Sequence, residues 1–258
     1  MMRKDTPRSG TSADKTGVQK TDVRRFILRT SRTESDIEAA RALRAETFAS
    51  GKELSGDSWD ATASHFLIED RHDGTLVCCF RVQDFRACDA EESYSAGFYD
   101  LARLQTFGGI LTEVGRFCVA PGRRDPDILR LAWSAIAAHA GRQGTRLLFG
   151  CSSFRGTDPM VFGDALALLR ERHIAPGSWL PGVRAPDVFR FSGLGDHAPD
   201  PVQALRSMPP LLRSYLRLGA RVSDHAVIDR QMNTTHVFTG LDISVVPASR
   251  RRLLERLT

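Results

Sequence analysis

The chain has 258 residues, of which 41% are hydrophobic and 26% charged, so it can bury the core of one large globular domain. It contains no apolar run near the roughly 20 residues that span a bilayer, and its five cysteines show no metal-ligand spacing. Residues 1–25 hold seven Lys or Arg and three Asp, which accounts for +4 of the net charge of +5. The nearly neutral remainder lacks the basic stripe typical of nucleic-acid binders. We therefore expect a cytoplasmic protein with no transmembrane helix, no metal and no nucleic-acid partner.

The N-terminal segment is polar and basic and shows no hydrophobic periodicity. It also lacks the apolar region of a secretory signal. We predict a disordered basic tail over residues 1–23 and a single domain over residues 24–258.

The first part of this domain predicts a strand, a helix and a hairpin. A strand at about residues 25–28 precedes a helix, whose start is indicated by the capping-box-like pair Thr33 and Asp36. Two apolar runs, at 65–68 and 76–80, flank an Asp-Gly pair, which is the signature of a β-hairpin.

The middle of the chain predicts a parallel strand pair. A strand over 110–119 is followed by an amphipathic helix over about 126–142 and by a strand over 146–151. Strand, helix and strand at this spacing require a crossover connection. Further helices are expected near 159–171 and 211–218, separated by a proline-rich excursion, with closing strands within 226–246. The whole pattern predicts an α/β fold with one mixed sheet.

Charged residues interrupt the strand over 110–119. Glu113 and Arg116 lie among apolar residues, where charges are costly unless they are paired or functional. Gly115 between them permits a bulge or the close approach of a ligand. A structural ion pair and a pair of functional residues facing a cleft both fit this pattern.

The loop after this strand, residues 120–124, joins it to a helix start and carries Arg123 and Arg124. Backbone N–H groups and positive side chains at such a junction suit a phosphate group. A solvated turn has the same composition, so the loop alone does not decide between the two.

Taken together, these residues resemble a known family. The run Glu-x-Gly-Arg-Phe-x-Val-x-Pro over 113–121, with Arg124 after it, resembles the fourth strand and phosphate loop of GNAT acyltransferases. More narrowly, the chain resembles the bacterial ornithine–acyl carrier protein N-acyltransferases, which are related to acyl-homoserine-lactone synthases. The resemblance covers most of residues 25–246. The other segments that match the family include Leu43-Arg44 with Phe48, the run over 57–67, Phe80-Arg81, the run over 94–101, Ser152-Ser153 and the run over 209–220.

The resemblance implies a fold, a reaction and two substrates. The fold is GNAT-like, with a mostly antiparallel mixed sheet, one parallel crossover pair and flanking helices. The reaction transfers a (3-hydroxy)fatty acyl group from acyl carrier protein to the α-amino group of ornithine, which gives lyso-ornithine lipid. The alternatives are an acyl-homoserine-lactone synthase, another GNAT amine acyltransferase, or a non-enzymatic module that binds acyl carrier protein.

Catalytic roles follow from the chemistry of this reaction. An α-ammonium must lose its proton before it attacks a thioester, and Glu113 is the candidate base. A bulged backbone N–H near Gly115 is the candidate oxyanion donor, and Arg116 completes the catalytic set. Regular strand alternation would point Glu113 and Arg116 to opposite faces, so both serve one site only if the strand bulges.

Substrate roles are assigned on the same resemblance. Ornithine carries a carboxylate, for which Arg44, Arg81 or Arg116 is a candidate partner, and a δ-ammonium, for which Asp57 or Asp60 is. Each of these has an exposed surface charge as its alternative. Phe48, Ser152 and Ser153 are further substrate-binding candidates, and the candidates for the donor phosphopantetheine are Phe117, Val119, Arg123 and Arg124.

The prediction of the acyl donor depends on a departure from the superfamily pattern. Acetyl-CoA-dependent members carry a Gly-x-Gly/Ala turn after the loop arginine, whereas here Asp125-Pro126-Asp127 follows Arg124. Two acidic residues would repel a pyrophosphate. We therefore expect acyl-phosphopantetheine on acyl carrier protein as the donor, with no bound cofactor.

Both ends of the chain are basic. Residues 250–257 form a short amphipathic segment with four arginines. Such a segment favours transient contact with anionic lipid at the inner face of the membrane or with the acidic surface of acyl carrier protein. A solvated tail is the alternative.

Overall fold

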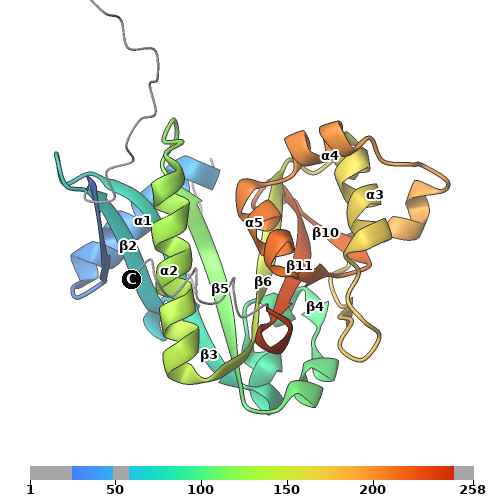
Figure 1. Ribbon diagram of the computed structural model, residues 1–258, viewed down its shortest axis with the longest axis horizontal. Coiled ribbons are helices and arrows are strands. Elements are labelled where there is room, and N and C mark those ends of the chain that lie inside the picture. Colours follow the sequence, from blue (N-terminus) through green and yellow to red (C-terminus); the bar gives the residue numbers. More distant parts are fainter. Residues whose placement is uncertain (1–24, 49–57, 247–258) are drawn as a thin grey trace, which may run out of the picture.

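The computed structural model describes residues 25–48 and 58–246, which form a nine-stranded sheet with helices on both faces (Figure 1). The strand order is β1-β2-β3-β5-β6-β11-β10-β8, with β9 paired to β11. Within the described chain, β5 and β6 run parallel and the other paired strands run antiparallel. The predicted mixed sheet with one parallel crossover pair is therefore confirmed.

The strands and helices follow the predicted order. The strands are β1 (Phe26–Thr30), β2 (Ser64–Asp70), β3 (Leu76–Arg86), β4 (Tyr99–Asp100), β5 (Ile110–Val119), β6 (Thr145–Arg155), β7 (Gly182–Val183), β8 (Val188–Arg190), β9 (Arg221–Val222), β10 (His225–Asp229) and β11 (Thr234–Asp242). The α-helices are α1 (Glu34–Phe48), α2 (Pro126–Gln143), α3 (Gly163–Arg172), α4 (Pro201–Ser207) and α5 (Pro210–Leu218). Strands β4 and β7 form a separate two-stranded sheet.

The predicted bounds hold best where capping and periodicity agree. Strand β5 has the predicted bounds, and α2 begins where the Asp125 side chain accepts a hydrogen bond from the Asp127 N–H. Helix α5 ends at Gly219, which adopts a left-handed conformation. The described residues contain no helix long and apolar enough to cross a membrane.

Two predictions were wrong in extent. Strand β6 continues to Arg155 rather than ending near 151, because its polar second half pairs with β11 along its whole length. The helix expected from 159 begins at Gly163, after a short 3-10 turn over Pro159–Phe162. The proline-rich excursion also contains a short helix, α4.

The helices cover the two faces of the sheet. Helix α2 packs on one face, where Ile128, Trp133 and Ile136 share a core with Phe80 and Val114. Helix α1 packs on the opposite face, in a smaller core with residues of β2, β3 and β5. In Figure 1, α2 accordingly lies in front of the first half of the sheet and α1 behind it.

The two parallel strands pair over only part of their length. Their register runs from Ile110 opposite Thr145 to Glu113 opposite Phe149, and the strands then separate. At this point Gly150 lies against Val114, so closely that a Cβ on Gly150 would be 2.3 Å from the Val114 carbonyl oxygen. Figure 1 shows β5 and β6 separating towards the top of the view.

Candidate active site

A β-bulge in β5 places Arg116 on the same side as Glu113. Cys79 of β3 is paired with Cys118 and Arg81 with Gly115, so β5 contains one residue more than β3 over this interval. The extra residue is Arg116, which has a φ of 52°. Its guanidinium carbon lies 4.7 Å from the centre of the Tyr94 ring. The condition under which Glu113 and Arg116 can serve one site is therefore met.

Glu113 is a buried carboxylate held by backbone and hydroxyl donors. Its Oε1 accepts hydrogen bonds from the Ser95 N–H at 2.8 Å and from Ser95 Oγ at 2.5 Å. Its Oε2 accepts a hydrogen bond from the Tyr94 N–H at 3.1 Å. Burial raises the pKa of Glu113 above its ordinary value, although the Ser95 hydrogen bonds and the charge of Arg81 act in the opposite direction. A carboxyl group with a raised pKa is suited to accept a proton near neutral pH.

A cavity of about 610 Å³ lies where β5 and β6 separate. On β6, Cys151 and Ser153 alternate with Gly150 and Ser152, and all four line the cavity. Because successive side chains of a strand point to opposite faces, the cavity reaches both faces of the sheet. Glu113 lies on the Cys151 face, since Ser95 Oγ contacts both residues. Residues of α2 and α5 lie on the other face.

Ten of the predicted site residues line this cavity. They are Phe48, Glu113, Gly115, Arg116, Phe117, Val119, Arg123, Arg124, Ser152 and Ser153. The structure thus brings together the predicted catalytic set, the predicted donor-binding set and part of the predicted substrate-binding set. Their individual roles stay predictions at this point.

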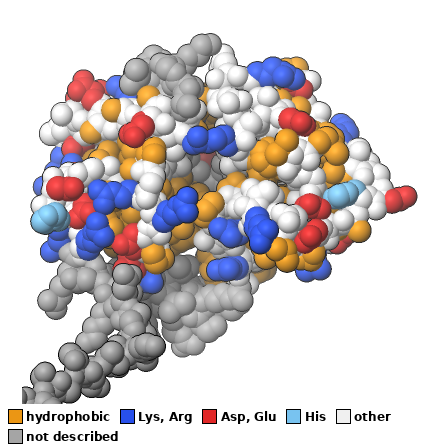
Figure 2. All heavy atoms as spheres, turned by 90° about the horizontal axis from the view of Figure 1, so that it is seen from above, with side chains coloured by type: hydrophobic (Ala, Val, Ile, Leu, Met, Phe, Trp, Pro, Cys, Tyr) orange, Lys and Arg blue, Asp and Glu red, His pale blue; other side chains and the backbone are white. Residues whose placement is uncertain are grey.

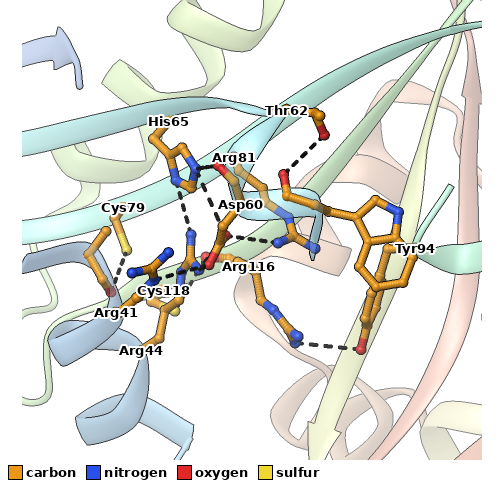
Figure 3. Close-up of polar contacts among 12 residues, drawn as sticks. Arg41, Arg44, Asp60, Thr62, His65, Cys79, Arg81, Tyr94, Arg116 and Cys118 are labelled. Atoms are coloured by element: carbon orange, nitrogen blue, oxygen red, sulfur yellow. Dashed lines mark hydrogen bonds and ion pairs between the residues drawn. The ribbon is translucent and has the colours of Figure 1, made fainter. Parts of the chain in front are cut away.

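Three predicted substrate-binding residues have a different environment. Arg44, Asp60 and Arg81 are buried together, and Arg44 Nη1 and Arg81 Nη1 donate to Asp60 at 2.8 and 2.9 Å (Figure 3). His65 joins this cluster through Nδ1, which lies 3.1 Å from Arg44 Nη2. None of the four is among the described residues that line the cavity. Asp57 lies outside the described residues.

The cluster still touches the site through one residue. The guanidinium carbon of Arg81 lies 5.6 Å from the centre of the Tyr94 ring, while Arg116 Nη1 donates to the Tyr94 hydroxyl at 3.5 Å. Tyr94 therefore contacts both arginines, and Figure 3 shows it to the right of the two guanidinium groups. Because Arg81 is held by Asp60, the buried cluster fixes the position of one wall of the site.

Sequence reasoning missed several cavity residues. Tyr94 lies in a run that carried the family resemblance, but no role was assigned to it. Asp229 and His236 come from the β10–β11 hairpin, where an aspartate next to a turn has the ordinary signature of turn capping. The α5 residues were predicted as a helix and belong to a run that supported the family resemblance, but no role was assigned to them. No local signal in the sequence places these residues opposite Glu113.

Comparisons with known proteins identify the family of this chain. Residues 40–134 match the model of the acetyltransferase (GNAT) domain. The chain is 30% identical over 250 residues to the L-ornithine N(alpha)-acyltransferase of Rhodobacter capsulatus. The alignment covers 90% of this chain and 95% of that protein. It is 32% identical over 240 residues to the protein of the same name from Rhizobium meliloti, covering 84% of this chain and 80% of the relative.

A solved structure supports the fold. FeeM, an N-acyl amino acid synthase from uncultured soil microbes, superposes with a TM-score of 0.50 at 13% sequence identity and covers 86% of this chain and 94% of its own. This likeness concerns the fold alone. The sequence relatives carry the family assignment, and they show that this chain is an acyltransferase that belongs to the L-ornithine N(alpha)-acyltransferase family.

Proposed function

We propose that this enzyme transfers a (3-hydroxy)fatty acyl group from the phosphopantetheine arm of acyl carrier protein to the α-amino group of L-ornithine, which gives lyso-ornithine lipid. The observation that carries the proposal is the cavity between β5 and β6, which contains Glu113 and Arg116 and reaches both faces of the sheet. A donor and an acceptor can therefore approach the same point from opposite sides. The names of the sequence relatives specify ornithine and its α-amine.

The acceptor side contains the base. Glu113 takes a proton from the α-ammonium, directly or through water, and the neutral nitrogen then attacks the thioester carbonyl. A C–N bond forms and the C–S bond breaks, and the phosphopantetheine thiolate leaves and takes up a proton. Backbone N–H groups at the bulge near Gly115 stabilise the oxyanion of the tetrahedral intermediate. Arg116, held against Tyr94, pairs with the carboxylate of the amino acid.

The donor side lies towards α2 and α5. Phe117 and Val119 pack against the α2 core and line the cavity, which suits an apolar pantetheine arm. Arg123 is partly engaged by Asp70, whose carboxylate it contacts at 3.3 Å, whereas Arg124 is exposed at the rim. Figure 2 views the molecule from above the orientation of Figure 1, on the side where β5 and β6 separate. Basic side chains lie among hydrophobic ones over the middle of this face.

The charges beside Arg124 favour a donor with a single phosphodiester. Asp125 caps α2 and lines the cavity, so its carboxylate lies close to any phosphate bound there. The second acidic residue, Asp127, is buried and paired with Arg130. The Asp125 carboxylate would repel a diphosphate more strongly than it repels the single phosphodiester of a carrier-protein arm. The basic segment over 250–257, outside the described residues, supplies transient contact with the membrane surface that receives the product.

Mass spectrometry of the reaction products tests this proposal. The purified protein is incubated with 3-hydroxyacyl carrier protein and either ornithine or S-adenosylmethionine, and we expect N-acylornithine from the first mixture only. An acylated lactone from the second mixture would identify an acyl-homoserine-lactone synthase instead. Equal turnover with the corresponding acyl-CoA would overturn the choice of acyl carrier protein as donor.

A further inference from the structure

The β10–β11 hairpin contributes two polar side chains to the acceptor side of the cavity. Asp229 is paired with Thr234, and Val227 with His236, so all four side chains point to one face of the sheet. His236 is also paired with Ser153 of β6, which places this face on the Glu113 side. Asp229 and His236 both line the cavity.

His236 presents a buried hydrogen-bond acceptor to the site. The hydroxyl of Tyr99 lies 2.9 Å from the carbonyl oxygen of His236 and 3.1 Å from its Nδ1. The tautomer with a proton on Nδ1 satisfies both contacts, because the Tyr99 hydroxyl then donates to the carbonyl oxygen and Nδ1 donates to the Tyr99 oxygen. The Nε2 atom is then unprotonated. Nε2 is buried, and none of the residues that the structure describes hydrogen-bonds to it.

His236 stays neutral at physiological pH. Burial, aided by the nearby His225, lowers the pKa of His236 to about 3. Its Nε2 therefore remains an acceptor, and a buried acceptor without a donor is costly. A ligand that supplies a donor at Nε2 would remove this cost.

Asp229 adds a negative charge to the same face. Its Oδ1 accepts a hydrogen bond from the Met232 N–H at 3.0 Å, and a carboxylate with two oxygens can accept several more. Burial raises the pKa values of Tyr94 and Cys151, and the charge of Asp229 adds to both effects. This coupling indicates that Asp229 lies close to the part of the cavity that contains Glu113.

The other described carboxylates that line the cavity have other roles. Among the described residues that line it, the acidic ones are Glu113, Asp125 and Asp229. Glu113 serves as the base in the proposed function, and Asp125 caps α2 on the donor side. Among the carboxylates that the structure describes, Asp229 therefore remains for a positively charged group of the acceptor. Asp60 cannot fill this role, because it lies in the buried arginine cluster.

We propose that Asp229 and His236 bind the δ-ammonium of the acceptor and so select an amino acid with a positively charged side chain. The proposal rests on the proposed function, since it concerns the acceptor of that reaction. A primary ammonium has three donors and no acceptor, which matches a carboxylate together with a neutral imidazole nitrogen. Arg116 suits the carboxylate end of the same molecule, so the site carries complementary charges for both ends.

Norvaline provides a matched probe, because it is ornithine without the δ-amino group. In Asp229→Asn, we expect kcat/KM for ornithine to fall roughly 10- to 100-fold, mainly through KM, with kcat/KM for norvaline unchanged. Asparagine keeps an oxygen for the Met232 N–H, so the turn is preserved. His236→Asn keeps a polar group for Tyr99 but removes Nε2, and a smaller loss is expected.

Asp242→Asn is the matched control. Asp242 is half-buried and caps a turn in the same way, with Oδ1 accepting from the Ser244 N–H at 2.8 Å, but it does not line the cavity. Its ratio of ornithine to norvaline turnover should equal that of the wild type. An unchanged ratio in Asp229→Asn would overturn the proposal.

Calorimetric binding of ornithine and norvaline separates this proposal from the proposed function. If the wild type binds ornithine more tightly than norvaline and Asp229→Asn abolishes this difference in affinity, the result supports the ammonium site even if no acyl transfer occurs. If the wild type binds both amino acids equally, the site is wrong even where ornithine is acylated.

Discussion

At the scale of single residues, Glu113 carries the largest predicted effect on turnover. Replacing Glu113 with Gln removes the proposed base but keeps a side chain of the same shape, so kcat should fall about 100-fold or more. Because burial raises its pKa, kcat/KM of the wild type should rise with pH through a value above the ordinary 4.5. Initial rates across pH measure both effects. The variant should lack this rise, and a rise that persists in it would contradict the assignment.

The same carboxyl group provides a check on folding. Since the pKa of Glu113 is higher in the folded state, its contribution to stability is present at low pH and is lost as pH rises through the folded value. Glu113→Gln cannot ionise there, so its free energy of unfolding should fall less between acidic and neutral pH than that of the wild type. A loss of activity in a variant that unfolds cooperatively then reflects chemistry.

Asp60 shows why residue roles are hard to predict from sequence. The family resemblance made Arg44, Asp60 and Arg81 substrate-binding candidates with an exposed surface charge as the alternative, and the structure buries all three. A buried ion cluster and a substrate site place the same residue types in the same local context. What distinguishes them is which charges meet in space, and these partners are 16 and 21 positions apart. Burial acts to raise the pKa of Asp60, but the charges of Arg44 and Arg81 outweigh it and hold the carboxylate ionised.

At the scale of elements, local patterns predicted more. The pattern of apolar residues placed β5 and α2, and the crossover rule then gave the parallel pair. The bulge was suggested by Gly115, but the residue inserted into the strand is Arg116. Sequence periodicity cannot fix such a register, because it depends on how β5 pairs with β3. The length of β6 was underestimated for a related reason, since its polar residues face a cavity rather than a core.

The point where β5 and β6 separate leads to a prediction for Gly150. Gly150→Ala would place a Cβ 2.3 Å from the Val114 carbonyl oxygen, so the strands must shift. We expect the free energy of unfolding to fall by about 1–3 kcal/mol, and acyl transfer to fall because Glu113 and the bulge lie on the shifted strand. Denaturant unfolding and initial rates measure the two changes.

Gly141 offers the control for this substitution. It lies in α2, and a Cβ there meets no described atom within 4 Å. Gly141→Ala should leave turnover unchanged and raise the free energy of unfolding by about 1 kcal/mol or less. If Gly150→Ala behaved like Gly141→Ala, the close approach of the two strands would have no part in shaping the site.

At the scale of the whole molecule, the proposed function requires the two substrates to reach the site by different routes. The cavity reaches both faces of the sheet, with the predicted base on one face and the α2 and α5 residues on the other. An amino acid is small enough to reach Glu113 through the acceptor side. A carrier protein must stay outside and deliver only its arm, so its recognition depends on the surface around the donor side. Arg124 is an exposed residue at the rim of this side.

Charge reversal at this rim tests how the carrier protein is recognised. Acyl carrier protein has an acidic surface, so Arg124→Glu should lower kcat/KM for acyl carrier protein about 10-fold at low salt and less at high salt, because salt screens exposed charges. The KM for ornithine should not change, since Arg124 lies on the donor side. Arg142→Glu makes the same reversal on an exposed residue at the opposite end of α2 and should have little effect. Equal losses in both variants would mean that total charge, rather than a docking surface at the donor side, governs the encounter.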